Sequence, residues 1–193
     1  GLGKIAVLRL GHRVKRDQRV SSHVALTARA LGADEVVFSG EYDPGLLESV
    51  SKVVERWGGN FKVSYTPSWR TFIAERKTRG EYIVHLTMYG IGIQEVEEEL
   101  RRAHEERGLV LIVGSSKVPI EVYEEADINV AVTHQPHSEI AALAIALDRI
   151  HKGRELYFTY RDAKISIKPS RRGKAERKPP NRIAKQDGLE HDG

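Results

Sequence analysis

Three polar loops that each follow an apolar run contain the residues best placed for chemistry in this 193-residue chain. The apolar runs YIVHL (82–86), LVLIV (109–113) and INVAV (128–132) have the length of buried strands. Each is followed by a loop that carries glycine, serine, threonine or histidine. Small ligands bind at the carboxyl ends of parallel strands, where backbone groups and short polar side chains meet. The sequence therefore predicts a ligand site at one edge of a sheet.

The known phosphate-binding fingerprints do not fit these loops. Gly90 and Gly92 begin a GxG pattern, but Glu95 stands where a dinucleotide-binding loop has its third glycine. The segment GSSKVP (114–119) lacks the upstream glycine and the following Ser or Thr of a P-loop. The histidines are not spaced as a metal-binding pair on a helix, and no carboxylate cluster accompanies them. We expect no metal site.

The composition indicates a soluble protein of the cytoplasm. The chain has no cysteine, which excludes disulfides and thiol nucleophiles and fits a reducing compartment. It has no run of about 18 apolar residues, and it does not begin with the pattern of a signal peptide. We therefore expect no membrane partner.

Basic residues gather in two separate segments. Residues 161–185 contain ten Lys and Arg residues and two acidic residues, so this segment has a net charge of +8, while the whole chain has a net charge of only +4. A second cluster, residues 9–19, holds five Lys and Arg residues opposed by Asp17 alone. Such patches on an otherwise slightly acidic protein favour a nucleic-acid partner. A solvated tail explains the C-terminal segment equally well.

The elements that position the three loops alternate between strand and helix, which predicts an α/β fold with a mostly parallel, doubly wound sheet. The expected strands are residues 4–10, 35–39, 60–65, 82–86, 109–113 and 128–132. The expected helices are residues 22–31, 44–57, 69–79, 93–106, 119–123 and 138–150.

The pattern changes after Gly153. Apolar residues alternate on both sides of residues 161–163, which predicts a two-stranded hairpin. From Ser170 onward the chain is basic and nearly free of apolar residues, which is typical of a flexible tail. We expect one domain over residues 1–152, a hairpin over 153–169 and a basic tail over 170–193.

The segments LTMYG, VGSSKVP and NVAVTHQPHSEIAALA, read with RLGHRVKRDQRVSSHVALTARALGA near the N-terminus, resemble the RNA methyltransferases of the SPOUT superfamily. Within it they are most similar to the archaeal enzymes that methylate the ribose 2'-hydroxyl of cytidine 56 in the T-loop of tRNA. The resemblance spans roughly residues 4–168. It implies a C-terminal trefoil knot that binds S-adenosylmethionine, a tRNA substrate and a homodimer.

The resemblance also implies a set of site residues. The cofactor would be bound by Leu86, Thr87, Gly90, Val113, Gly114, Ser115, Lys117, Val130, Val132, Pro136, His137 and Ser138. The SPOUT ribose methyltransferases use an arginine near their first helix, which here implies Arg19, with Arg16 and His23 as rivals. The basic residues expected to contact RNA are Arg9, Arg13, Lys15, Arg171, Arg172, Lys174, Arg177 and Lys178.

Two other functions stay open on the sequence alone. A SPOUT enzyme that methylates a base nitrogen would share the same loops. An RNA-binding module with a vestigial cofactor pocket would keep the basic segments and lack the activity.

Overall fold

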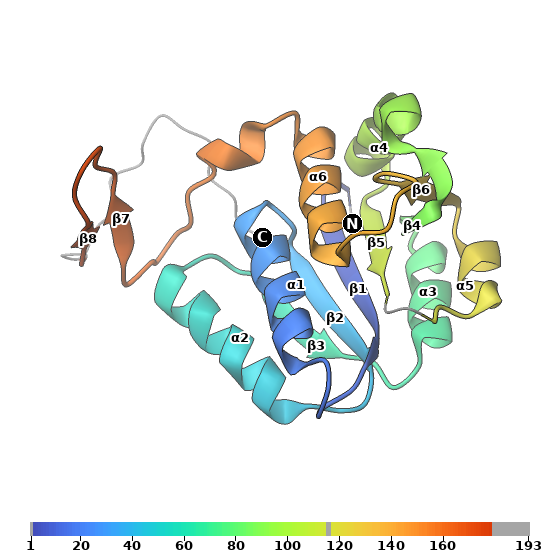
Figure 1. Ribbon diagram of the computed structural model, residues 1–193, viewed down its shortest axis with the longest axis horizontal. Helices are drawn as coiled ribbons and strands as arrows, with labels where there is room; N and C mark the ends of the chain where they lie inside the picture. The colour runs from blue at the N-terminus through green and yellow to red at the C-terminus, as the bar shows by residue number, and fades with distance from the viewer. Residues whose placement is uncertain (1, 115–116, 179–193) are drawn as a thin grey trace.

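The computed structural model describes residues 2–114 and 117–178, and it contains a six-stranded parallel sheet with helices on both faces (Figure 1). The strand order is β3-β2-β1-β5-β4-β6. The strands are β1 Ile5–His12, β2 Glu35–Gly40, β3 Lys62–Tyr65, β4 Tyr82–Gly92, β5 Leu109–Val113 and β6 Ile128–Ala131. The helices are α1 Gln18–Ala30, α2 Pro44–Trp57, α3 Trp69–Thr78, α4 Ile93–Glu106, α5 Ile120–Glu125 and α6 Glu139–His151. The predicted doubly wound α/β fold is confirmed.

Two apolar layers hold the helices against the sheet. The larger layer joins one face of the sheet to α1, α2, α4 and α6. The smaller layer joins the other face to α3 and α5 through residues such as Phe72 and Val122. The central strand β5 is buried along its whole length, as a strand covered on both faces must be. Its continuous apolar run is what made the parallel sheet predictable.

Strand β4 is longer than predicted and contains an irregular excursion. Both Leu86 and Ile91 pair with Val130 of β6, so the residues between them are extra to the ladder. The expected loop after residue 86 is therefore part of a strand that leaves the sheet edge and returns to it. This detour gives β4 residues on the ligand side of the edge without ending the strand.

Helix α1 begins earlier than predicted, at Gln18, after Asp17 in the N-cap position. Asp17 accepts hydrogen bonds from the backbone N–H and the Nε of Arg13, at 3.1 and 3.2 Å. Burial raises the pKa of Asp17, but the hydrogen bond with Arg13 and the charges of Arg13 and Arg9 hold it below its usual range. Arg19 consequently lies inside the first turn of the helix and not ahead of it.

A C-terminal hairpin is present, but it lies later in the chain than predicted. Its strands are β7 Ser166–Lys168 and β8 Ala175–Arg177. The expected first strand is instead the 3-10 helix η1 Arg154–Tyr157 and an extended segment that packs on the main domain. The ring of Phe158 lies against that of His151, and the Tyr160 hydroxyl donates to the Arg29 carbonyl at 2.6 Å. The alternating apolar residues of this segment therefore contact helices and do not form a pair of strands.

The packing of η1 on the main domain can be tested through Glu155, because this packing should make the stability of the protein depend on pH. It is 3% exposed, and burial together with the neighbouring carboxyl of Asp148 raises its pKa to about 7. Because the folded pKa lies above that of an unfolded glutamate, the stabilisation is complete below pH ~4.5 and is lost as the pH rises through 7. We expect the free energy of unfolding to fall by about 2 kcal/mol more between pH 5 and 8 in the wild type than in Glu155→Gln. Urea denaturation at both pH values measures the difference.

Other titrating groups contribute equally to the pH dependence of the wild type and of Glu155→Gln, so their contributions cancel in the comparison. Asp17 and Asp43 have lowered pKa values, so their contribution to the pH dependence falls below this window. Equal pH dependence in the wild type and the variant would contradict the docking of Glu155.

Candidate active site

A cavity of about 420 Å³ opens where the carboxyl ends of β4, β5 and β6 meet the first turn of α6. All three predicted loops contribute to its wall, as the strand order β5-β4-β6 requires. It is lined by His85, Leu86, Thr87, Met88, Tyr89, Gly114, Val118, Tyr123, Val132, Thr133, Gln135, Pro136, His137, Ser138, Glu139 and Ala142. This mixture of apolar walls and a few polar groups is typical of a pocket for a small organic ligand.

Most of the predicted cofactor residues belong to this pocket. Those that line it are Leu86, Thr87, Gly114, Val132, Pro136, His137 and Ser138. Val113 and Val130 do not, because their side chains are fully buried in the apolar core beneath it. Ser115 lies outside the described residues, and the exposed Lys117 is not part of the lining.

Two glycines shape the pocket by close approach. A side chain on Gly90 would overlap the backbone of Asn129 and Val130, so Gly90 supports the wall from behind and does not line it. A Cβ on Gly114 would lie 2.6 Å from the Val118 side chain, itself part of the lining. Gly114 does not have a positive φ. Glycine is therefore needed here because a side chain would collide with Val118, and not because of the backbone conformation.

His85 is a pocket residue that the sequence did not indicate. Its Nδ1 lies 2.9 Å from Asn129 Oδ1, and Asn129 Nδ2 donates to the Tyr123 carbonyl at 3.0 Å. This orientation of the amide makes Nδ1 the donor and leaves Nε2 as an acceptor. Burial lowers the pKa of His85, although the hydrogen bond with Asn129 acts in the opposite direction. A neutral His85 offers the pocket a fixed acceptor for an amine or hydroxyl of a ligand.

The third loop is tied to the first across the pocket. His134 Nδ1 lies 2.8 Å from the carbonyl of Met88, and Ser138 caps α6 by accepting from the N–H of Ile140 at 3.1 Å. Tyr123 closes the far side, with its hydroxyl 3.2 Å from Thr87 Oγ1. These contacts join the first loop to the third loop and to helix α5.

Arg9 corrects the prediction of an RNA contact. Its side chain is 1% exposed, and its Nε lies 3.0 Å from Oε1 of Glu139 at the start of α6. It also donates to the carbonyl of Leu10. Because β1 is covered on both faces, Arg9 points into the protein and cannot reach a phosphate outside it. Arg9 supports the pocket wall from beneath.

The three catalytic candidates lie outside the cavity. Arg16, Arg19 and His23 are exposed at the amino-terminal end of α1 and just before it, and none belongs to the lining. Helix α1 packs along α6, and a groove between them begins at Ser138, which also lines the pocket. Arg19 and His23 therefore lie on a helix that borders the pocket through α6, and Arg16 lies just before that helix.

A buried series of hydrogen bonds connects Ser21 of α1 to His12 and Asp43. His12 Nδ1 lies 2.7 Å from Ser21 Oγ, and His12 Nε2 lies 2.9 Å from Asp43 Oδ2. Ser21 is 0% exposed, which excludes it as a nucleophile for any substrate. Burial raises the pKa of Asp43, but hydrogen bonds from His12 and from the Leu46 N–H hold it below its usual range. These hydrogen bonds join the end of β1 to α1 and α2. They therefore fix the position of the basic segment between β1 and α1.

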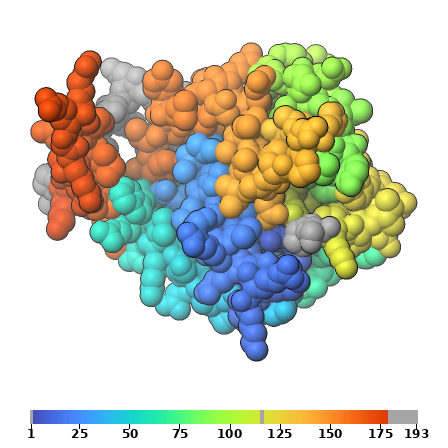
Figure 2. Space-filling model, viewed as in Figure 1, coloured from blue at the N-terminus to red at the C-terminus, as the bar shows by residue number. Residues whose placement is uncertain are grey.

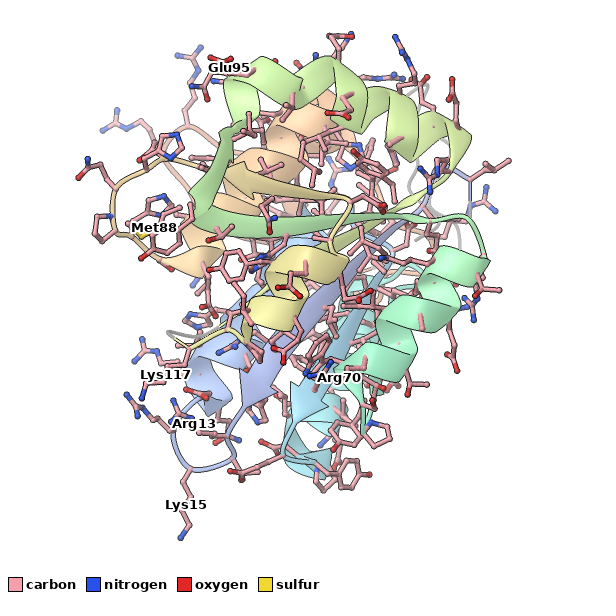
Figure 3. The ribbon with its side chains drawn as sticks, turned by 90° about the vertical axis from the view of Figure 1, so that its right-hand side faces the viewer. Arg13, Lys15, Arg70, Met88, Glu95 and Lys117 are labelled. Carbon is pink, nitrogen blue, oxygen red and sulfur yellow. The ribbon has the colours of Figure 1, made fainter. Side chains whose placement is uncertain are left out.

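The predicted RNA contacts fall into two groups. Figure 3 shows Arg13 and Lys15 on the side of the molecule that also carries Met88 of the pocket and Lys117, which was predicted to bind the cofactor. Figure 2 shows the blue segment before α1 projecting at the lower edge of the molecule. The hairpin β7-β8 lies at one end of the long axis, away from the segment before α1 (Figure 1). It carries Arg171, Arg172, Lys174, Arg177 and Lys178, which are all exposed.

A metal centre and a membrane-spanning helix are both absent from residues 2–114 and 117–178. No group of three or more His, Cys, Asp or Glu side chains there is arranged to hold a metal ion. In the same residues, no helix is long and apolar enough to cross a membrane.

Solved structures with a similar fold are RNA methyltransferases. The crystal structure of an RNA 2'-O ribose methyltransferase has a TM-score of 0.60 at 16% identity and covers 80% of this chain and 58% of its own. The TrmH/SpoU tRNA modifying enzyme of A. aeolicus has a TM-score of 0.56 at 19% identity, with coverage of 80% and 77%. The AdoMet-bound rRNA methyltransferase of Sinorhizobium meliloti has a TM-score of 0.57 at 19% identity, with coverage of 79% and 57%. The chain thus has the SPOUT methyltransferase fold.

Sequence comparison defines the family within that fold. A family model described as tRNA ribose 2'-O-methyltransferase, aTrm56, matches residues 57–177. The tRNA (cytidine(56)-2'-O)-methyltransferase of Methanocaldococcus jannaschii is 56% identical over 170 residues, which cover 88% of this chain and 94% of the relative. The enzyme of that name from Thermococcus kodakarensis is 52% identical over 174 residues, with coverage of 88% and 94%. The chain belongs to the aTrm56 family of tRNA ribose 2'-O-methyltransferases.

Proposed function

We propose that the protein transfers a methyl group from S-adenosylmethionine to the ribose 2'-hydroxyl of cytidine 56 in tRNA. The observation that carries this proposal is the pocket formed by the three loops in a chain of the aTrm56 family. The relatives that match nearly the whole chain bear the name of this activity.

The residues of the pocket fit the cofactor. Apolar side chains such as Leu86, Val118 and Val132 suit the adenine ring, and the acceptor nitrogen of His85 suits an amine or hydroxyl. Glycine at 114 leaves room beside Val118. The cofactor, when bound, supplies an activated methyl group.

The remaining residues of the chain position the acceptor. We assign Arg19 to the ribose hydroxyl and its phosphate, where a guanidinium orients the group and stabilises developing negative charge. Arginine is a poor base because its guanidinium holds its proton firmly, so orientation and charge are its contributions. Arg13, Lys15 and Lys117, on the side of the molecule that carries Met88 of the pocket, are assigned to the tRNA backbone.

Methylation of unmodified tRNA in vitro tests the proposal. After ribonuclease digestion, mass spectrometry should find one added methyl group on the ribose of cytidine 56. A methyl group on a base would instead support the base-methylating alternative. Absence of cofactor binding by calorimetry would support an RNA-binding module with a vestigial pocket.

We also propose that the protein is a homodimer and that its knotted C-terminal part binds the cofactor, as the resemblance implies. Support for the dimer comes from the groove of about 590 Å³ between α1 and α6. Its lining is almost wholly apolar: Leu26, Thr27, Ala30, Leu31, Ser138, Ile140, Ala141 and Ala144. An exposed apolar strip of this kind along two helices fits a second copy of the chain.

The dimer is tested by a charge placed in the groove. Ala141 is exposed there, so Ala141→Arg should leave the fold intact and raise the dissociation constant of the dimer by at least tenfold. Ala74→Arg is the matched control, because Ala74 is exposed on α3 at the other face of the sheet. Sedimentation velocity over a range of concentrations measures both. A monomeric wild type, or an Ala141→Arg protein that dimerises as the wild type does, would refute the proposed interface.

A further inference from the structure

Glu139 is the only Asp, Glu, Lys or Arg among the described residues that line the pocket. It is the first residue of α6 and follows the capping residue Ser138. Among the apolar and neutral polar groups of the described lining, this carboxylate is the one side chain that carries a full charge. The pocket is therefore suited to a cationic ligand.

Arg9 fixes the position of this carboxylate. Its buried guanidinium is anchored by the carbonyl of Leu10 and lies with Nε 3.0 Å from Glu139 Oε1. Oε1 is buried, whereas the Glu139 side chain as a whole is 21% exposed. The exposed part of the side chain is thus not the oxygen that faces Arg9.

The ion pair leaves the Glu139 charge incompletely compensated. Although the two atoms are close, the N–H of Arg9 Nε is not aligned for a hydrogen bond, and Oε1 receives none. Burial raises the pKa of Glu139, and the charge of Asp17 raises it further, against the lowering by Arg9. A second cation on the pocket side would act in the same direction as Arg9 and stabilise the carboxylate.

We propose that the Glu139 carboxylate, held by Arg9, binds the sulfonium group of S-adenosylmethionine and lets the pocket distinguish this cation from the neutral thioether left after methyl transfer. The inference rests on the proposed function. The sulfonium is favoured over the α-amino group by the place of Glu139 in the fold. Its neighbour Ser138 borders the groove with α1, and Glu139 lies near enough to Asp17, at the start of that helix where the acceptor is assigned, for the Asp17 charge to raise the pKa of Glu139.

The test measures binding and not turnover. Calorimetry gives the dissociation constants of S-adenosylmethionine and S-adenosylhomocysteine for the wild type and for Glu139→Gln. We expect the affinity for S-adenosylmethionine to fall about tenfold, or ~1.4 kcal/mol, while that for S-adenosylhomocysteine changes less than twofold. Equal weakening of both ligands would place Glu139 at a group they share and overturn the proposal. Unchanged affinity for both would overturn it as well.

A second variant covers the case in which Glu139→Gln fails to fold, since it leaves the Arg9 charge buried without its partner. The double variant Arg9→Met/Glu139→Gln removes both charges and should lose the same selectivity for S-adenosylmethionine. Glu124→Gln, which removes an exposed carboxylate on α5, is the control and should bind both ligands as the wild type does.

The two proposals fail in different ways. A wild type that binds no S-adenosylmethionine and methylates no tRNA would refute the proposed function itself. A wild type that does both, with a double variant of unchanged selectivity, would refute only the role of Glu139.

Discussion

Replacing Arg19 by alanine should lower methyl transfer to tRNA by about 10²- to 10³-fold and leave the affinity for S-adenosylmethionine unchanged. Arg19 is exposed in the first turn of α1 and does not line the cofactor pocket, so its removal disturbs neither the fold nor cofactor binding. A group that stabilises charge only in the transition state lowers kcat and kcat/KM together. Single-turnover methylation with saturating tRNA, alongside calorimetry with the cofactor, measures both quantities.

Arg16→Ala and His23→Ala serve as comparisons, since both side chains are exposed close to Arg19. If Arg19→Ala retains activity within tenfold of the wild type, its assignment fails. A larger loss in one of the other two variants would then transfer the role to that residue.

Gly90→Ala should destabilise the protein and weaken cofactor binding at the same time. Its methyl group would overlap the backbone of Asn129 and Val130, and Asn129 is held by hydrogen bonds to His85 and Tyr123. The backbone must shift, at a cost of about 2 to 3 kcal/mol, which lowers the melting temperature by roughly 4 to 12 °C. Because the same excursion of β4 forms the pocket wall, we expect the affinity for S-adenosylmethionine to fall more than tenfold. Calorimetry by heating and by titration measures the two effects.

Gly45→Ala is the matched control for Gly90→Ala. Gly45 lies in the first turn of α2, and a Cβ there would meet only Asp43 Oδ1, at 3.5 Å. Alanine in a helix is more stable than glycine, so this variant should be as stable as the wild type or slightly more stable. A Gly90→Ala protein with the stability and affinity of the wild type would show that β4 and β6 approach less closely than described.

The regular elements followed directly from the sequence. Helices α2 and α4 begin and end at the predicted residues, because each combines a clear apolar stripe with a stop at Gly58 or Gly108. Strand β5 was equally clear from its continuous apolar run. In these elements local preference and tertiary packing favour the same structure.

The parts that sequence reasoning missed depend on partners far away in the chain. The polar side chain of Arg9 in an apolar strand suggested the surface, and only the position of Glu139, distant in sequence, explains its burial. The alternation of apolar and polar residues around Phe158 and Tyr160 is expected both for a strand and for an extended segment packed on helices, so the sequence does not distinguish the two. His85 gave no local signal at all, because its role depends on Asn129 and Tyr123.

The distance between the two basic regions sets a requirement on substrate length. The hairpin β7-β8 lies at one end of the long axis, away from the pocket and from the segment before α1 (Figure 1), so an RNA bound at the pocket must extend along the molecule to contact the hairpin as well. An RNA long enough to span both regions would meet this requirement, and in the proposed dimer the hairpin of the second copy would offer another route. A minimal T-arm and an intact tRNA should therefore share the same contacts at the modified nucleotide and differ in how firmly the rest of the molecule is held.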